Sequence, residues 1–126
     1  MALIVVDSDV VIDHLHSRPG QSSTLLEVAE ENELGIASVT LFEVERGLSS
    51  ATQRERFQRV LAAATFLPLD EPAARSAALI AYDLDRRGQK LDVADALIAG
   101  IALSVGAKLL TRNRKHFTRV SGLELV

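Results

Sequence analysis

Three acidic side chains occupy positions from which they could bind a divalent cation. Asp7 directly follows the apolar run at residues 2–6. Glu43 lies near the start of a helical segment, and Asp95 belongs to a segment that is apolar on nearly every face. Carboxylates that gather at one place repel each other unless a cation joins them, and oxygen ligands select a hard ion such as Mg²⁺ or Mn²⁺. Such an ion activates water and offsets charge on a phosphate, so the three acids predict metal-dependent hydrolysis.

Each of these acids also has a purely structural interpretation. Asp7 could cap the helix that follows it, because aspartate at this position accepts hydrogen bonds from the first turn. Thr40 and Glu43 have the spacing of a capping box, and Asp95 could interact with the N-terminal dipole of its helix. Asp92 is the expected N-cap of that same helix. Asp95 is then not needed as an N-cap, and it lies on an otherwise apolar helix. Because burial of an unpaired carboxylate is energetically costly, we expect Asp95 to have a charged partner or a bound metal.

A polar turn with the sequence Thr111-Arg112-Asn113 follows a later strand. Asn113 offers a carbonyl oxygen to a metal, and the Arg112 guanidinium is suited to phosphate. Five cations without an intervening acid form a candidate phosphate-contacting patch here: Lys108, Arg112, Arg114, Lys115 and Arg119. The alternative is a polar turn within a solvated charged loop.

The three histidines are not expected to bind metal. His14 and His16 stand two residues apart and cannot share a helix face. His116 stands among basic residues, which disfavours a cation beside it.

The elements that must position these side chains alternate between strand and helix. Apolar runs of strand length occur at residues 2–6, 34–37, 66–69 and 107–110, with a candidate fifth at 123–126. Helical periodicity separates them, at residues 9–16, 22–32, 40–48, 51–64, 72–87 and 93–105. This alternation predicts an α/β fold, a three-layer sandwich with a central parallel sheet of four to five strands flanked by helices. The acids and the polar turn then lie at the carboxyl edge of the sheet, where open α/β sheets bind ligands.

Length and composition limit the class of protein. The chain has 126 residues, which fits a single domain over residues 1–126. A formal charge of −3 argues against a generally basic coat for nucleic acid, and the lack of cysteine excludes disulfides and thiolate metal sites. The opening apolar run is too short for a signal-peptide core or a membrane span. We therefore expect a cytoplasmic protein.

Four motifs, taken together and in this order, resemble the PIN-domain family, and in particular the VapC-type toxins of bacterial toxin–antitoxin pairs. The resemblance extends from Leu3 to about Phe117 and rests on Val5-Val6-Asp7-Ser8, Ser38-Val39-Thr40-Leu41-Phe42-Glu43, Asp95-Ala96-Leu97-Ile98-Ala99 and Leu110-Thr111-Arg112-Asn113. It implies an endoribonuclease with one or two Mg²⁺ or Mn²⁺ ions. It also implies RNA as substrate, a small VapB-like antitoxin as partner, a homodimer, and a toxin–antitoxin hetero-oligomer.

The resemblance also assigns roles to residues. Asp7, Glu43 and Asp95 match the family's three acidic positions, and Ser8 matches the small hydroxyl residue that orients the first of them. The fourth acidic position corresponds to Asn113, an amide where many relatives have aspartate, which lowers the charge expected at a second metal position. Thr111 is expected to support the site.

Two other functions are compatible with parts of the sequence. The run Leu3 to Val11 also looks like the signature of haloacid-dehalogenase-like phosphatases, with Asp7 as nucleophile and Asp9 as general acid. That family further needs a lysine at the sheet edge, for which only Lys90 is available before Asp92. The second alternative is a degenerate PIN domain that binds RNA or protein without cutting, with Asn113 as a mark of decay.

Overall fold

The central sheet is parallel and has four strands in the part of the chain that the computed structural model describes, residues 2–126. The strands are β1 (Leu3–Val6), β2 (Glu33–Ala37), β3 (Thr65–Leu67) and β4 (Lys108–Leu110), in the order β3-β2-β1-β4. The apolar run at residues 2–6 thus becomes an inner strand between β2 and β4. The candidate fifth strand contributes only a single parallel bridge, between Leu125 and Leu109.

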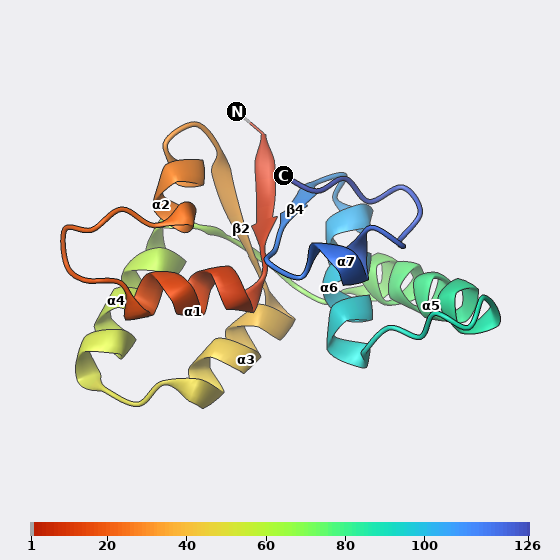
Figure 1. Cartoon of the computed structure of the whole chain (residues 1–126), viewed down its shortest axis with the longest axis horizontal. Coiled ribbons are helices and arrows are strands. Elements are labelled where there is room, and N and C mark those ends of the chain that lie inside the picture. Colours follow the sequence, from red (N-terminus) through yellow and green to blue (C-terminus); the bar gives the residue numbers. More distant parts are fainter. Residues whose placement is uncertain (1) are drawn as a thin grey trace.

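Helices cover both faces of this sheet, which confirms the predicted three layers (Figure 1). One face carries α1 (Ser8–His16), α2 (Thr24–Ala29), α3 (Ser38–Gly47) and α4 (Ala51–Ala63). The other carries α5 (Glu71–Arg86), α6 (Val93–Ser104) and α7 (Arg114–Phe117). None of the helices in residues 2–126 is long and apolar enough to span a membrane.

Alternation along β1 divides the hydrophobic core into two clusters. Ile4 and Val6 pack with α1–α4, whereas Val5 faces the cluster formed by α5, α6 and the segment after β4. Successive side chains of a strand point to opposite faces, so one short strand can supply both clusters. The same geometry places the carboxyl end of β1, and with it Asp7, between the two helical layers.

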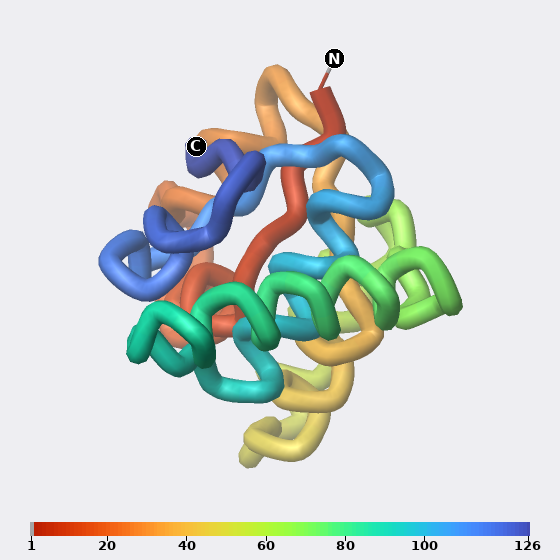
Figure 2. Tube along the Cα trace, turned by 90° about the vertical axis from the view of Figure 1, so that its right-hand side faces the viewer, coloured from red at the N-terminus to blue at the C-terminus, as the bar shows by residue number. Residues whose placement is uncertain are grey.

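Helix α6 lies in the interior, as its apolar sequence predicts. Figure 2 shows α5 crossing in front of it. The two helices approach closely at Gly100, where an added Cβ would lie 2.6 Å from both the Ala73 carbonyl oxygen and the Ala77 nitrogen of α5. This approach fixes the depth of α6 and therefore the position of Asp95 in its first turn.

Candidate metal centre at the carboxyl edge of the sheet

Asp7 directly follows β1 and caps α1, so its expected capping role is confirmed. Its Oδ1 accepts a hydrogen bond from the Ser8 N–H at 2.8 Å, and its Oδ2 accepts one from the Thr111 hydroxyl at 2.8 Å. The residue is only 5% exposed. The pKa of Asp7 is raised to about 6, mainly by burial; the hydrogen bonds from Thr111 and Ser8 act against this rise, and the Asp9 and Asp95 carboxylates add to it. The carboxylate is thus held in place in a position where its negative charge is costly.

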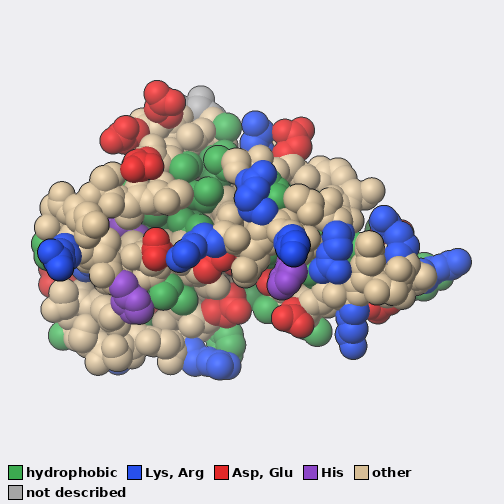
Figure 3. All heavy atoms as spheres, viewed as in Figure 1, with side chains coloured by type: hydrophobic (Ala, Val, Ile, Leu, Met, Phe, Trp, Pro, Cys, Tyr) green, Lys and Arg blue, Asp and Glu red, His purple; other side chains and the backbone are tan. Residues whose placement is uncertain are grey.

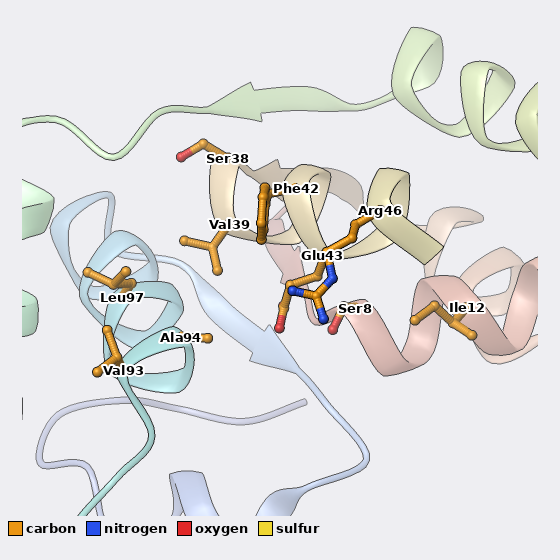
Figure 4. A pocket seen from close by; sticks show the side chains of 10 residues that line it. All are labelled: Ser8, Ile12, Ser38, Val39, Phe42, Glu43, Arg46, Val93, Ala94 and Leu97. Atoms are coloured by element: carbon orange, nitrogen blue, oxygen red, sulfur yellow. The ribbon is translucent and has the colours of Figure 1, made fainter. Parts of the chain in front are cut away.

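Glu43 has no capping role, so the capping-box interpretation is wrong. Helix α3 begins at Ser38, two residues earlier than predicted, and its N-cap position is Ala37. Glu43 therefore lies in the second turn of the helix. The Thr40 hydroxyl is buried and has no hydrogen-bond partner among the described residues. Figure 4 shows the Glu43 carboxylate pointing toward Ser8, away from the start of its own helix.

Asp95 lies in the first turn of α6 with its side chain 21% exposed. Asp92 occupies the N-cap position as predicted, although its side chain forms no capping hydrogen bond within residues 2–126. Burial raises the pKa of Asp95, and the Asp92 and Glu43 carboxylates act in the same direction. His116 opposes them, with its Nδ1 3.7 Å from Asp95 Oδ2. Asp95 therefore lies within electrostatic range of the other two predicted acids.

The turn after β4 reaches this edge through its backbone and through Thr111. The Asn113 N–H donates to the Thr111 hydroxyl oxygen at 3.0 Å, and the same hydroxyl donates to Asp7. Thr111 thus links the turn to the acidic group. Asn113 is exposed at the N-cap position of α7 and makes no side-chain capping bond to the described chain. Ser8 contacts Asp7 through its backbone N–H, whereas its hydroxyl faces the neighbouring groove (Figure 4).

Arg112 is held against helix α1. Its backbone N–H donates to Asp9 Oδ2 at 3.1 Å, and its guanidinium pairs with Asp13 at 3.1 Å. Other cations of the predicted phosphate-contacting patch are also engaged within the chain. Lys108 lies 3.8 Å from Glu124, Arg114 donates to the Val126 carbonyl, and Arg119 donates to the carbonyls of His116 and Gln89.

These contacts distribute the cations over the surface. Figure 3 shows Lys and Arg side chains over α7 and the neighbouring part of α5, with acidic side chains and a histidine among them. The face is therefore of mixed charge, and its contact with phosphate stays a prediction.

A groove of about 720 Å³ opens beside Glu43. Side chains of three helices line it: Ser8, Ile12, Ser38, Val39, Phe42, Glu43, Arg46, Val93, Ala94 and Leu97. In Figure 4, Val93 and Leu97 of α6 face Val39 and Phe42 of α3, and the Arg46 guanidinium lies beside Glu43 and Ser8. The groove thus combines apolar walls with a charged end next to the acids.

Two residues of this region, Arg46 and His116, were missed as site residues by the sequence analysis. Arg46 follows Glu43 by three positions, which places both on one face of a helix. Its position beside Glu43 could therefore have been predicted from the sequence. For His116 no spacing rule indicates the approach to Asp95, because the two residues belong to different elements. Arg46 also lies over the Phe42 ring, 5.8 Å from its centroid.

The donor chemistry of this edge fits a hard divalent cation. Carboxylate oxygens are the ligands that Mg²⁺ and Mn²⁺ prefer, and the raised pKa values of Asp7 and Asp95 reflect burial and mutual repulsion that a cation would relieve. In residues 2–126, however, no three acidic or histidine side chains form a preassembled metal cluster. The acids are neighbours, and cation binding would have to draw them closer.

The raised pKa of Asp7 predicts a pH-dependent stability. A carboxyl group whose pKa rises from 3.8 to about 6 on folding stabilises the folded state fully below pH 3.8, and this contribution is lost as the pH rises through 6. A shift of this size corresponds to about 3 kcal/mol. We expect the unfolding free energy of the wild type, relative to Asp7→Asn, to fall by about 2.4 kcal/mol between pH 4 and pH 7.5, because the unfolded chain is already partly ionised at pH 4.

Urea unfolding in EDTA at the two pH values measures this difference. The other titratable groups are present in both proteins, so their contributions cancel when the unfolding free energy of the wild type is compared with that of Asp7→Asn. If the difference in unfolding free energy between the wild type and Asp7→Asn does not change with pH, burial does not raise the pKa of Asp7 as described.

The chain is similar to known proteins along nearly its whole length. The family model described as "PIN domain" matches residues 4–123. Ribonuclease VapC10 of Mycobacterium tuberculosis is 32% identical over 115 residues, which cover 91% of this chain and 86% of that protein. The crystal structure of VapBC2 from Rickettsia felis bound to a promoter DNA fragment superposes with a TM-score of 0.83, at 19% identity, over 98% of this chain and 97% of that one. A toxin–antitoxin complex from Klebsiella pneumoniae gives a TM-score of 0.70 at 25% identity, over 98% and 95% of the two chains.

Proposed function

The chain belongs to the PIN-domain family, and we propose that it is a metal-dependent endoribonuclease, the toxin of a toxin–antitoxin pair. The observation that carries this proposal is that Asp95 lies within electrostatic range of both Asp7 and Glu43 at the carboxyl edge of the sheet, in a chain matched by the family model over residues 4–123. The similarity to a protein named ribonuclease supports the reaction class. Hydrolysis of a phosphodiester bond is the reaction that such a group of carboxylates suits best.

In this proposal the three carboxylates hold one Mg²⁺ or Mn²⁺, and Asn113 offers a further oxygen. When bound, the ion activates water for attack on the phosphate and offsets the negative charge that develops there. The chain holds two of these donors in place at the sheet edge. Thr111 and the Ser8 N–H hold both oxygens of Asp7, so its carboxylate cannot rotate freely. The packing of α6 against α5 fixes Asp95.

The two alternatives from the sequence are not favoured. The phosphatase interpretation requires Asp9 as a general acid, but its Oδ2 accepts the Arg112 N–H, which gives Asp9 a structural role in the turn after β4. Membership in the PIN-domain family also places the chain outside the phosphatase family. The interpretation as a degenerate, non-cutting PIN domain relied on the amide at Asn113. The three acids Asp7, Glu43 and Asp95 are nevertheless all present at the sheet edge.

Partners follow from the same relatives. One similar structure is described as a toxin–antitoxin complex, and another contains VapB and VapC together with promoter DNA. We propose that this chain likewise binds a small VapB-like antitoxin, forms a homodimer, and assembles into a hetero-oligomer with its antitoxin. The groove between α3 and α6, apolar and charged at one end, is a suitable surface for a peptide segment.

A cleavage assay tests the nuclease proposal. Purified protein free of antitoxin is incubated with total cellular RNA in Mg²⁺, in Mn²⁺ and in EDTA, beside an Asp7→Ala/Asp95→Ala double variant. We expect discrete fragments with 5′-phosphates that require metal and are absent with the double variant. Intact RNA under every condition would contradict the proposal, and cleavage by the double variant would reveal a contaminating nuclease.

Arg112 gives a second, more specific prediction. Its proposed task is to contact phosphate, which requires that RNA displace Asp13 from the guanidinium. We expect Arg112→Ala to weaken RNA binding several-fold and to lower the slope of log affinity against log salt by about 1, because one phosphate contact is lost. Asp13→Asn should act in the opposite direction, because it frees the guanidinium. Metal binding should be unchanged in both variants.

RNA binding is measured across a range of salt concentrations with a fluorescent oligonucleotide in EDTA. If Arg112→Ala lowers metal affinity as strongly as RNA affinity, the residue supports the acidic group and does not contact phosphate.

A further inference from the structure

We propose that His116 supplies a nitrogen donor to the same cation as Asp95, and that this donor makes the centre prefer Mn²⁺ to Mg²⁺. The inference rests on the proposed function, because it concerns the metal that the acids would hold. It adds a ligand of a different chemical kind to a site otherwise built from oxygen. It also reverses the expectation, drawn from the basic residues around it, that His116 stays away from metal.

The first observation is the distance between the two side chains. His116 Nδ1 lies 3.7 Å from Asp95 Oδ2, which is longer than an ordinary hydrogen bond. Two donors that each lie about 2.1 Å from one ion can be at most about 4.2 Å apart. The spacing of the pair is therefore within the reach of one ion, and binding of both donors at right angles would draw them to about 3.0 Å.

The second observation is the support that the backbone around His116 receives. Its N–H donates to the Asn113 carbonyl at 3.1 Å, and its carbonyl accepts the Arg119 Nε–H at 3.2 Å. Arg119 also donates to the Gln89 carbonyl in the segment between α5 and α6, and the fully buried Phe117 fixes α7 in the core. The backbone that carries the imidazole is thus held at the sheet edge, and the His116 side chain is 55% exposed and accessible to an ion.

The third observation concerns the neighbouring cations, whose charge disfavoured a metal in the sequence analysis. The Arg114 guanidinium donates to the Val126 carbonyl, and the Arg119 guanidinium donates to Gln89. These two guanidinium groups are engaged with backbone carbonyls, and the groups that face the imidazole include the carboxylate of Asp95. Both guanidinium groups keep their positive charge, so the feature that favours a cation at Nδ1 is the Asp95 carboxylate 3.7 Å away.

The choice of metal follows from the donor. Mg²⁺ strongly prefers oxygen ligands, whereas imidazole is a good ligand for transition metals, and Mn²⁺ tolerates both oxygen and nitrogen. A centre with carboxylates and one imidazole should therefore bind Mn²⁺ more tightly than an all-oxygen centre does, with little gain for Mg²⁺. Asparagine at position 116 would retain a polar group but present an oxygen in place of the nitrogen.

Metal binding by the intact protein, without RNA, tests this. Calorimetric titration with MnCl₂ and with MgCl₂ is compared for the wild type, His116→Asn and His16→Asn; His16 is an exposed histidine on α1 and serves as the matched control. We expect His116→Asn to lower Mn²⁺ affinity by about 10- to 100-fold and Mg²⁺ affinity by less than about 3-fold. His16→Asn should leave both affinities unchanged. Pulsed electron paramagnetic resonance of bound Mn²⁺ should show coupling to a ¹⁴N nucleus in the wild type and in His16→Asn only.

The outcomes separate this inference from the function on which it rests. If the wild type binds Mn²⁺ with no ¹⁴N coupling, and His116→Asn keeps the wild-type ratio of affinities, His116 is not a ligand, while metal-dependent RNA cleavage can still stand. If the wild type binds neither ion, both this inference and the proposed metal centre are overturned. The ¹⁴N measurement on the wild type needs no variant, so a folding defect in His116→Asn would not obscure the result.

Discussion

Asparagine in place of Asp95 is expected to lower the rate of RNA cleavage by roughly a thousand-fold, since the loss of several kcal/mol of metal-dependent stabilisation translates into a factor of this order. The variant should also lose the rise in melting temperature that millimolar Mg²⁺ or Mn²⁺ gives to the wild type, because an ion that binds only the folded state must stabilise it. In EDTA the variant should be at least as stable as the wild type. Burial raises the pKa of Asp95, so removing its charge removes a cost of folding at neutral pH.

Asp92→Asn is the matched control. Asp92 is three residues away, exposed, and forms no side-chain capping bond within the described chain, so its replacement changes charge near Asp95 without removing a proposed ligand. Cleavage by this variant should stay within several-fold of the wild type. Equal loss of activity in the two variants would mean that net charge at the start of α6 matters and that Asp95 has no special role. Activity and melting temperature, each measured with and without metal, decide between these outcomes.

Alanine at Gly100 is expected to destabilise the whole fold by about 2 to 4 kcal/mol, at the upper end of what overpacking costs. The added Cβ would lie 2.6 Å from two backbone atoms of α5, the Ala73 oxygen and the Ala77 nitrogen. Backbone atoms of a packed helix cannot rotate away as a flexible side chain can, so α5 and α6 must separate. The intrinsic preference of alanine for a helix, about 1 kcal/mol over glycine, offsets only part of this cost.

Gly47→Ala provides the control for helix propensity alone. Gly47 ends α3, and a Cβ there would meet no atom of the described chain within 4 Å. Its replacement should leave stability unchanged or raise it by up to about 1 kcal/mol. Urea unfolding in EDTA measures both variants. If Gly100→Ala is as stable as the wild type, the close approach of α5 and α6 is not a determinant of the fold.

Because α6 carries Asp95, the Gly100 variant also connects packing with activity. Separation of α6 from α5 would move the first turn of α6 relative to Asp7 at the end of β1. RNA cleavage at a temperature where the variant is still folded should therefore fall further than the loss of folded protein explains. A specific activity equal to that of the wild type would show that the acidic group tolerates a shift of α6.

The sequence by itself determined the class of fold and singled out the three acids as candidate ligands. Strand runs and helical periodicity depend on neighbouring residues only, so the parallel sheet and its two helical layers could be predicted before any contact was known. Asp7 could be placed at the carboxyl end of an inner strand for the same reason. Asp95 could be singled out because a carboxylate on an apolar helix demands a partner.

Only the tertiary structure decided which polar groups meet at the sheet edge. Glu43 lost its predicted capping role because α3 begins at Ser38, and helix starts depend on how the preceding strand ends. The Arg112 guanidinium lies on Asp13 because the turn after β4 reaches α1. His116 of α7 lies beside Asp95 of α6 because both helices pack on the same face of the sheet. The spacing of residues along the chain predicts contacts within a single helix or strand. Contacts between elements depend on packing, which sums many weak interactions over the whole core and leaves no local pattern in the sequence.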